Sequence, residues 1–466
     1  MDQFDLVTIG SGPAGEKGAA QAAYFGYKVA VIDRNPRPGG APVNSGGIPT
    51  KTLREAATYL TGFGRREIYG VGLGLGPDLM LERLRSRALE VQEAMGRAVR
   101  HNLERHGIEF VVGEATLDDG AVRVVEASGS ERILTADVVL IATGSRPLHP
   151  SGIPFDDPDV HDSDTILDLG RIPSSMVVIG AGPVGAEYAS IFTALGVSVT
   201  MIDMADRIAP FLDAEVSEVL KQIMEEEGVR MALGTTGTIQ RTQGRLEVVL
   251  GDGEILYPDV VLFAAGRVGN TEELGVAAAG VRCDERGRIL VDEEYHTTAD
   301  GIYAAGDVIG PPALASVSSE QGRVAVCHAF GIAFKDTVDP LPPFGVYSIP
   351  EVGMVGMTEA AATEEGIDFE VGKTWFVDNA RSAIAGTQRG FIKLVLERSD
   401  RRLIGAHIVG EEAAELIHQA QAVIHNRGTI DYFINSTYNV PTRSEAFKYA
   451  AYDALQRLSR AGSDSE

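Results

Sequence analysis

Apolar runs, glycine-rich turns and helical patterns follow one another in a fixed order at the start of the chain. Residues 4–9, Phe-Asp-Leu-Val-Thr-Ile, form a mostly apolar stretch that predicts a buried strand. It runs into Gly10-Ser-Gly12-Pro-Ala-Gly15, an alanine-rich stretch typical of a helix, and a second apolar strand at 28–33 that ends on Asp33. This order of strand, glycines, helix, strand and terminal acid predicts a dinucleotide-binding domain.

The same order returns 170 residues later, from Gly10 to Gly180. A strand at 176–179 leads into Gly180-Ala-Gly182-Pro-Val-Gly185, a helical stretch, and a strand at 198–203 that ends on Asp203. In each copy the first glycine allows a tight turn, the second lets a pyrophosphate approach the backbone, and the third lets the helix pack closely on the strand. The helix N-terminus faces the phosphates, and the terminal acid accepts hydrogen bonds from a ribose. The repeat therefore predicts an α/β fold with two Rossmann-like domains.

Length and composition restrict the number of domains, the possible partners and the location of the protein. A length of 466 residues predicts roughly three domains. The net charge of −25 argues against nucleic acid and against an anionic membrane as partners. No apolar run reaches the roughly 18 residues that span a bilayer. The N-terminus enters a strand without a secretory leader pattern, so we expect a cytoplasmic protein that does not insert into membranes.

Neither the cysteines nor the charged helical segment around 79–106 predicts a further functional site. Cys283 and Cys327 are the only cysteines, and their separation fits neither a disulfide framework nor a metal site, so we expect no metal. Apolar residues recur at helical spacing among charges around 79–106. That pattern predicts a packing helix there and not a binding site.

The segment from Gly39 to Lys51 carries a family resemblance. It resembles the flavoprotein disulfide reductases, the family of glutathione reductase and dihydrolipoamide dehydrogenase, whose pattern is Gly-Gly-x-Cys-x-x-x-x-Cys-Ile-Pro-(Ser/Thr)-Lys. Here Pro42 and Gly47 occupy the two cysteine positions, while the residues from Ile48 to Lys51 match. A dithiol relay cannot be built from proline and glycine.

Further segments are similar to the same family in the same order. The stretches 142–147 and 265–271 resemble its crossings between nucleotide-binding domains, and 301–307 resembles its second FAD fingerprint. The tail from Pro340 resembles its dimerisation domain. The resemblance implies an FAD-binding domain at 1–147 and 271–339, an NAD(P)-binding domain at 148–270, and an α+β dimerisation domain at 340–466 in a homodimer.

The resemblance also implies the residues that bind each cofactor. For FAD they are Gly10, Gly12, Gly15, Asp33, Arg34, Gly40, Lys51, Ala115, Thr143, Gly144, Asp307 and Ala315. For the nicotinamide dinucleotide they are Gly180, Gly182, Gly185, Asp203 and Gly266.

Two residues match the catalytic pair of the family. Lys51 and Glu187 occupy the positions of a lysine and a glutamate that pair beside flavin N5. A buried ammonium needs a carboxylate partner, and its charge stabilises an electron-rich reduced flavin. The alternative is that both are surface residues.

The proton carrier of disulfide chemistry is also replaced. The family uses a His-Pro-x-x-x-Glu element from the partner subunit, and here Val440 stands at the histidine while Pro441 and Glu445 remain. Valine cannot act as an acid or base, and Glu445 is interpreted as structural.

Within the family, the stretches 430–446 and 186–192 resemble the soluble pyridine nucleotide transhydrogenases, in which hydride enters and leaves through one nicotinamide pocket.

Asp203 bears on which nicotinamide dinucleotide is used. An acid at this position accepts bonds from a free 2′-hydroxyl and repels the 2′-phosphate of NADP. Arg207 is either a surface arginine or a group that reaches that phosphate, and Gly185 is compatible with NAD. We expect NAD(H) to be preferred, with NADP(H) use left open.

Three functions remain open on the sequence. The first is an FAD-dependent NAD(P)H oxidoreductase that passes hydride to a second nicotinamide. The second is an NAD(P)H dehydrogenase that passes electrons from FAD to a quinone or another small acceptor. The third is a flavin-binding scaffold or redox sensor without turnover, and retention of both Lys51 and Glu187 speaks against it.

Overall fold

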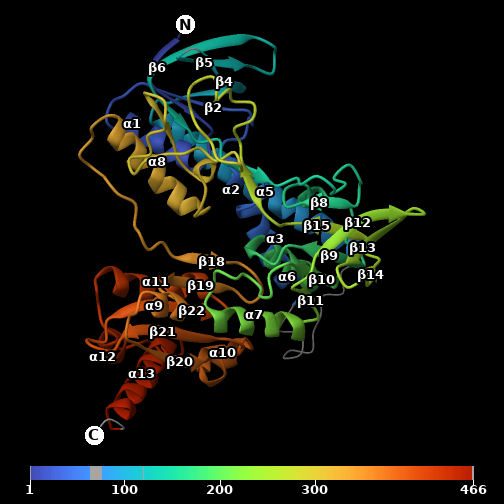
Figure 1. Ribbon diagram of the computed structural model, residues 1–466, viewed down its shortest axis with the longest axis vertical. Helices are drawn as coiled ribbons and strands as arrows, with labels where there is room; N and C mark the ends of the chain where they lie inside the picture. The colour runs from blue at the N-terminus through green and yellow to red at the C-terminus, as the bar shows by residue number, and fades with distance from the viewer. Residues whose placement is uncertain (1, 63–75, 119, 464–466) are drawn as a thin grey trace. The chain divides into compact units, whose positions relative to one another are not determined.

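The computed structural model describes residues 2–62, 76–118 and 120–463 and divides the chain into two compact units (Figure 1). The first unit comprises Met1–Thr52, Arg85–Leu148 and Gly266–Pro340. The second comprises Leu53–Leu84, His149–Ala265 and Leu341–Glu466. Each unit is therefore assembled from three separate stretches of chain.

A seven-stranded sheet forms the centre of the first unit. Strand β1 (Asp2–Ile9) pairs in parallel with β2 (Val29–Asp33) and with the end of β6 (Glu131–Ile141). Burial on both faces explains why β2 and the second half of β1 are mostly apolar. The other strands are β3 (Glu109–Val112), β4 (Glu114–Asp118), β5 (Ala121–Val125) and β17 (Ile302–Ala304), and a separate two-stranded ribbon joins β7 (Ser145–Pro147) to β16 (Arg267–Gly269).

Small residues bring two helices of the first unit together. Helix α1 (Pro13–Tyr24) packs against α8 (Ala315–Ala329) (Figure 1). A Cβ at Gly322 would lie 2.1 Å from the carbonyl oxygen of Ala14, so only glycine permits this approach. The remaining helical elements are α2 (Gly40–Asn44), η2 (Asp307–Ile309) and parts of α3 (Ile48–Thr61) and α5 (Pro77–Arg105).

A fully parallel sheet lies in the second unit. Its order is β11-β10-β9-β15-β8, and every neighbouring pair is parallel. Helix α6 (Pro183–Ala194) follows β9, and α7 (Ala214–Glu226) follows β10. The strands are β8 (Val160–Asp162), β9 (Ser175–Ile179), β10 (Ser198–Asp203), β11 (Arg230–Leu233) and β15 (Val260–Phe263), with η1 (Thr165–Asp168) and an antiparallel set β12 (Gly237–Thr242), β13 (Arg245–Leu250) and β14 (Ile255–Leu256) beside them.

The C-terminal part of the second unit is an antiparallel sheet with helices. The sheet order is β18-β19-β22-β21-β20. Helix α13 (Ala446–Ser463) lies against β20, where Gly372 leaves room for the carbonyl oxygen of Ala450. The elements are β18 (Phe344–Val346), β19 (Val352–Gly356), β20 (Phe369–Trp375), β21 (Phe391–Glu397), β22 (Leu403–Val409), α9 (Glu359–Glu364), η3 (Phe376–Asp378), α10 (Ala380–Ala385), α11 (Ala413–His425) and α12 (Asp431–Asn435).

The predicted fold class is confirmed: two Rossmann-like regions and a C-terminal α+β region are present. The predicted packing helix at 79–106 is α5. The units break near the predicted limits, after Leu148, Ala265 and Pro340. Two units do not separate three domains, so the predicted domain limits remain a prediction. Among the described residues, no helix is both long and apolar enough to cross a bilayer.

Candidate functional site

The first glycine turn, Gly10–Gly15, has no room for a side chain at its first and last glycines. Gly10 has a φ of +106°, and a Cβ there would lie 2.2 Å from the carbonyl oxygen of Ala142. A Cβ at Gly15 would lie 1.9 Å from the carbonyl oxygen of Gly10. Helix α1 begins after Gly12, and no side chain caps it. Its first N–H groups are therefore available to an anion.

Gly40 lies directly against this turn. Its φ is +60°, and a Cβ there would approach the Cα of Gly12 to 2.7 Å. The structure thus brings Gly40 to the glycine turn.

Asp33 ends β2 beside the same turn. Its Oδ2 accepts hydrogen bonds from the backbone N–H and the Oγ of Ser11, at 2.8 and 2.5 Å, and its Oδ1 accepts one from the N–H of Asn35 at 2.9 Å. An ionised carboxylate has about four acceptor positions. One remains for a hydroxyl of a bound ribose.

A cavity of about 560 Å³ opens at this end of the sheet. That volume lies within the range of small-molecule sites, about 300–1,000 Å³. Five residues predicted from the sequence line it: Gly10, Asp33, Arg34, Ala115 and Thr143. Arg146 in the same wall is paired with Glu272 at 2.7 Å.

The other residues predicted for the first cofactor lie elsewhere in this unit. Gly144 has a φ of +70° and follows Thr143, whose Oγ1 donates to the carbonyl oxygen of Asn270 at 2.8 Å. Asp307 begins η2, and its Oδ2 accepts from the Oγ of Ser145 at 3.1 Å. Ala315 is the first residue of α8, whose N-terminus also has no side-chain cap.

The second glycine turn repeats the geometry of the first. Gly180 has a φ of +115°, and a Cβ at Gly185 would lie 1.8 Å from the carbonyl oxygen of Gly180. Gly182 precedes α6 and has open space around it. Asp203 accepts hydrogen bonds from the N–H of Ala181 at 2.6 Å and of Ala205 at 2.8 Å. Both turns thus place an uncapped helix N-terminus beside an acid.

Gly266, the last residue predicted for the nicotinamide dinucleotide, lies in the first unit. Its φ is +132°, and its carbonyl oxygen accepts a hydrogen bond from the N–H of Leu148 at 3.0 Å.

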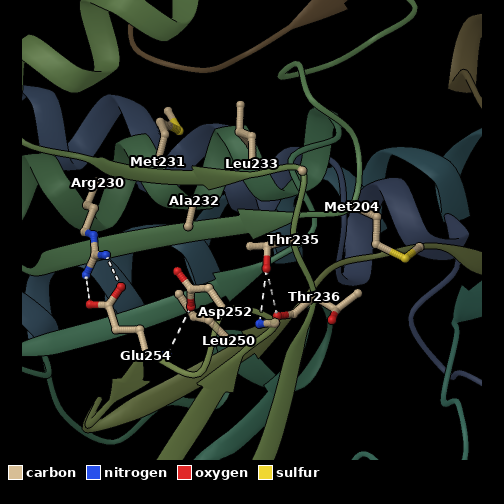
Figure 2. A pocket seen from close by; sticks show the side chains of 12 residues that line it. Met204, Arg230, Met231, Ala232, Leu233, Thr235, Thr236, Leu250, Asp252 and Glu254 are labelled. Carbon is tan, nitrogen blue, oxygen red and sulfur yellow. Dashed lines mark hydrogen bonds and ion pairs between the residues drawn. The ribbon is translucent and has the colours of Figure 1, made fainter.

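A cavity of about 760 Å³ adjoins Asp203 (Figure 2). Met204 lines it, and the carbonyl oxygen of Asp203 accepts a hydrogen bond from the N–H of Thr235 in its wall. Arg230 is the one cation among its described lining residues, and both of its terminal nitrogens bind Glu254, at 2.8 and 2.5 Å. Arg207 donates to the carbonyl oxygen of Pro210 at 2.7 Å.

Pro42 and Gly47 are in direct contact. A Cβ at Gly47 would lie 2.6 Å from the Cα of Pro42 and 2.7 Å from its carbonyl oxygen. The Oγ1 of Thr50 donates to the carbonyl oxygen of Gly47 at 2.9 Å. The space that a side chain at position 47 would need is therefore filled by backbone.

The predicted catalytic pair is divided between the units. Lys51 lies in the first turn of α3 in the first unit, and its Nζ donates to the Oγ1 of Thr50 at 3.3 Å. Glu187 lies on α6 in the second unit, is 7% exposed, and accepts a hydrogen bond from the N–H of Tyr347 at 2.9 Å. Their pairing stays a prediction. Sequence reasoning missed the Tyr347 contact, because nothing in the local pattern points across 160 residues.

The segment that carries Val440 lies between α12 and α13. Val440 is 68% exposed. Three residues on, the buried Arg443 pairs with Glu411 and with Glu412, each at 2.8 Å. Glu445 accepts a hydrogen bond from the hydroxyl of Tyr449 at 3.3 Å.

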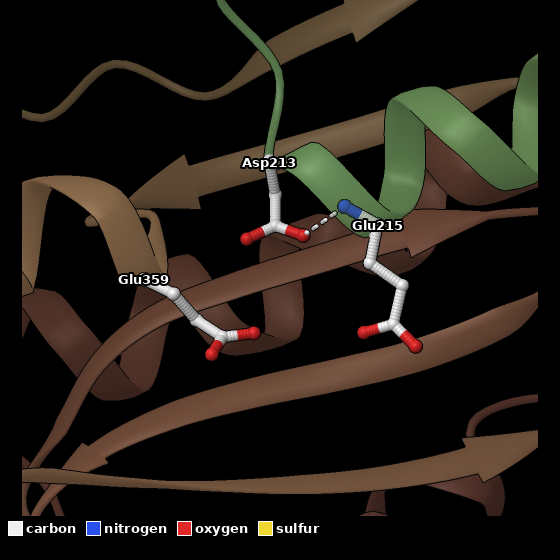
Figure 3. A group of neighbouring side chains, drawn as sticks. All are labelled: Asp213, Glu215 and Glu359. Carbon is white, nitrogen blue, oxygen red and sulfur yellow. Dashed lines mark hydrogen bonds between the residues drawn. The ribbon is translucent and has the colours of Figure 1, made fainter.

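Three carboxylates come together at the start of α7, from Asp213, Glu215 and Glu359 (Figure 3). The Nζ of Lys393 binds Asp213 at 2.7 Å and Glu215 at 3.2 Å, and it also pairs with Glu359. An ammonium group thus supplies the positive charge that this cluster needs. The two cysteines lie elsewhere, and burial raises the pKa of both the Cys283 and Cys327 thiols.

Comparison with known proteins identifies the family of the chain. Residues 4–322 match the family described as pyridine nucleotide-disulphide oxidoreductase, and residues 342–451 match its dimerisation domain. A protein of Mycobacterium bovis named soluble pyridine nucleotide transhydrogenase is 42% identical over 469 residues, covering 98% of each chain. One of the same name from Photobacterium profundum is 39% identical over 461 residues, again covering 98% of each.

Solved structures of flavoprotein disulfide reductases and related proteins share the fold of this chain over nearly its whole length. LpdA from Mycobacterium tuberculosis has a TM-score of 0.87 at 28% identity and covers 97% of this chain and 99% of its own. The HOCl-induced flavoprotein disulfide reductase RclA from Escherichia coli, solved as a Cu(II) complex, has a TM-score of 0.87 at 27% identity with the same coverage.

Proposed function

Because the chain belongs to the pyridine nucleotide-disulphide oxidoreductase family, we propose that it transfers hydride between two nicotinamide dinucleotides through FAD, as a transhydrogenase. It is an FAD-dependent oxidoreductase. The observation that carries the proposal is the contact between Pro42 and Gly47. Disulfide exchange has no groups and no space there, while both glycine turns remain built for dinucleotides.

The first unit fits FAD. The uncapped start of α1 and the closed turn at Gly10 and Gly15 fit a pyrophosphate, and Asp33 retains an acceptor for the adenosine ribose. Asp307 and the N-terminus of α8 would hold the rest of the cofactor. Bound there, FAD supplies a centre that accepts a hydride from one nicotinamide and returns it to another.

Lys51 and Glu187 are proposed as the catalytic pair. The ammonium group of Lys51 would stabilise negative charge on the reduced cofactor, and the carboxylate of Glu187 would hold that ammonium in place. The burial of Glu187 supports this role, since a buried carboxylate requires compensation.

The second unit supports a preference for NADH. Both oxygens of Asp203 accept hydrogen bonds, which keeps the carboxylate fixed where a 2′-phosphate would lie. The arginine in the adjoining cavity is already paired with Glu254. We propose that NADPH is used more weakly. We also propose that the protein is a homodimer, which the match to the dimerisation domain supports. We propose the cytoplasm as its location.

Anaerobic stopped-flow spectroscopy tests the proposal. NADH should bleach the flavin of the purified protein, and thio-NADP or thio-NAD should restore its absorbance within one turnover. Lipoamide and oxidised glutathione serve as matched acceptors and should restore none. Recovery with a quinone alone would instead assign an NAD(P)H dehydrogenase, and failure of NADH to bleach the flavin would leave a non-catalytic scaffold.

A further inference from the structure

A short segment that precedes β19, Tyr347–Glu351, is bonded to the helix that carries Glu187. The N–H of Tyr347 donates to the Oε1 of Glu187 at 2.9 Å. Two residues on, the N–H of Ile349 donates to the Oγ of Ser190 at 3.1 Å. Two amides of the segment, two residues apart, thus contact two positions of α6 that lie about one helical turn apart.

Ser190 links the two contacts. Its Oγ accepts from Ile349 and donates to the backbone carbonyl oxygen of Glu187 at 2.8 Å. Ser190 is 3% exposed, so water does not replace these bonds readily. Its hydroxyl therefore holds the segment against α6 in the position where the amide of Tyr347 donates to the carboxylate of Glu187.

The same segment is bonded to α3. The Nε of Arg54 donates to the carbonyl oxygen of Ser348 at 3.1 Å, and its guanidinium pairs with Glu351 at 3.2 Å. Arg54 and Glu351 are both buried, and Glu351 also accepts a hydrogen bond from the N–H of Ala414 at 3.2 Å. Arg54 lies one turn after Lys51 on α3. One segment is thus tied to both helices that carry the proposed catalytic pair.

We propose that Ser190 is a positioning residue for Glu187, acting through the segment Tyr347–Glu351. The inference rests on the proposed role of Glu187 in hydride transfer. A free glutamate side chain samples several rotamers, and fixing it in one costs conformational entropy. The amide of Tyr347 selects one orientation of the carboxylate, and Ser190 keeps that amide in place. Neither Ser190 nor Tyr347 contacts substrate in this role.

Ser190→Ala tests the proposal against Thr193→Ala. Thr193 lies one turn further along α6 and makes a comparable bond, from its Oγ1 to the carbonyl oxygen of Ala189 at 2.8 Å, within the helix. In Ser190→Ala, amide hydrogen exchange in a peptide spanning 344–352 should become faster. NADH should reduce the flavin at least about tenfold more slowly, since small misplacements at a reacting centre cost up to about 100-fold. The dissociation constant for NADH should change less than twofold. Thr193→Ala should match the wild type in all three measurements.

Amide exchange and the rate of flavin reduction together show which step of the proposal fails if it is wrong. Unchanged exchange in Ser190→Ala would show that Ser190 does not hold the segment, and faster exchange with an unchanged reduction rate would show that the segment does not position Glu187. Either result overturns the proposal. If wild-type flavin is not bleached by NADH, the proposed function fails, whatever the exchange data show. Ser190→Cys preserves size with a weaker acceptor, so it should give intermediate exchange and rate if Ser190→Ala does not fold.

Discussion

Position 47 shows how one residue restricts chemistry. In the family pattern it holds a thiol, but here even a Cβ would overlap the backbone of Pro42. The loss of disulfide chemistry is therefore a matter of backbone path as well as of side-chain identity. Restoring the two thiols by substitution meets a steric obstacle.

The double variant Pro42→Cys, Gly47→Cys should accordingly fail to become a disulfide reductase. A Cβ at position 47 needs the backbone at position 42 to move, and overpacking of this kind costs about 1–3 kcal/mol. Thiol titration after unfolding without reductant should find every cysteine free, and the melting temperature should fall. Turnover with lipoamide would contradict this expectation.

The charge of Asp203 should determine the preference between NADH and NADPH. Asp203→Asn removes the charge that repels a 2′-phosphate, so kcat/KM for NADPH relative to NADH should rise at least about fivefold, since 1 kcal/mol corresponds to that ratio. The change has a structural cost. Asp203 accepts two backbone N–H groups on separate oxygens, and asparagine has only one oxygen. Stability should fall by about 1–3 kcal/mol. An unchanged ratio of NADPH to NADH use would refute the reading of Asp203.

The sequence predicts individual residues well where a local motif fixes the geometry. The glycines of both turns lie where the spacing requires, and Gly40 meets Gly12. It predicts poorly where a contact joins distant segments. Ser190 is an ordinary helical serine by sequence, and its partner Ile349 lies 159 residues away.

At the scale of elements, β21 has an unusual side chain in its middle. The strand is buried almost throughout, yet it contains Lys393, which is 1% exposed. Lys393 and His407 are cross-strand partners on β21 and β22, and they share the face that meets Asp213 at the start of α7. The apolar pattern predicts the strand but not the acids that compensate the lysine, since these come from α7 and α9.

Lys393→Met should therefore destabilise the protein strongly. It leaves Asp213 buried without its partner, and breaking a buried pair costs about 3–5 kcal/mol. Lys373→Met is the control, because the Nζ of Lys373 pairs with Glu215 and the side chain is partly exposed, so this pair contributes at most about 1 kcal/mol. Chemical denaturation should show this difference. Adding Asp213→Asn should recover part of the loss; no recovery would place the defect in packing.

His407 makes stability depend on pH. It is fully buried, and burial lowers its pKa although Asp213 and Glu359 oppose the shift and Lys393 adds to it. Below about pH 6.5 the unfolded chain therefore binds a proton at this histidine more readily than the folded chain does. Stability from this group is present above that pH and falls by about 1.4 kcal/mol for each pH unit below it.

Urea unfolding at pH 7.5 and 5.5 measures this dependence. His407→Gln retains a donor for the carbonyl oxygen of Met357, to which the ring Nε2 lies within 2.8 Å. The variant should lose less stability than the wild type between the two pH values. Equal losses would assign the dependence to other groups.

At the scale of the whole molecule, the repeat of strand, glycine turn and helix predicts two nucleotide-binding regions, and both are present. The sequence does not show that the second of them shares a continuous core with the C-terminal sheet. Val346, Val352 and Phe391 pack in one cluster with residues of β9 and β10, such as Met176. Such packing depends on side chains far apart in the chain, and no local periodicity encodes it.

Large apolar side chains remain exposed on the C-terminal region, including Ile384, Tyr432, Val440 and Tyr449. We expect light scattering to give about twice the chain mass of 49.5 kDa. Val440→Glu should shift the protein toward monomer, because the matching family element lies at the partner subunit. Val125→Glu, at an exposed position of β5, should leave the mass unchanged. A monomeric wild type would contradict the proposed homodimer.

The presence of Pro42 and Gly47 in place of two cysteines also bears on which reagents can inactivate this protein. Arsenicals, heavy metals and electrophilic drugs inactivate dithiol enzymes by attacking paired or ionised thiols. Here the active segment offers them no sulfur. The two remaining thiols are kept protonated by burial, and a thiol reacts mainly as its anion. We therefore expect this flavoenzyme to keep its activity with nicotinamides under conditions that inactivate its thiol-dependent relatives.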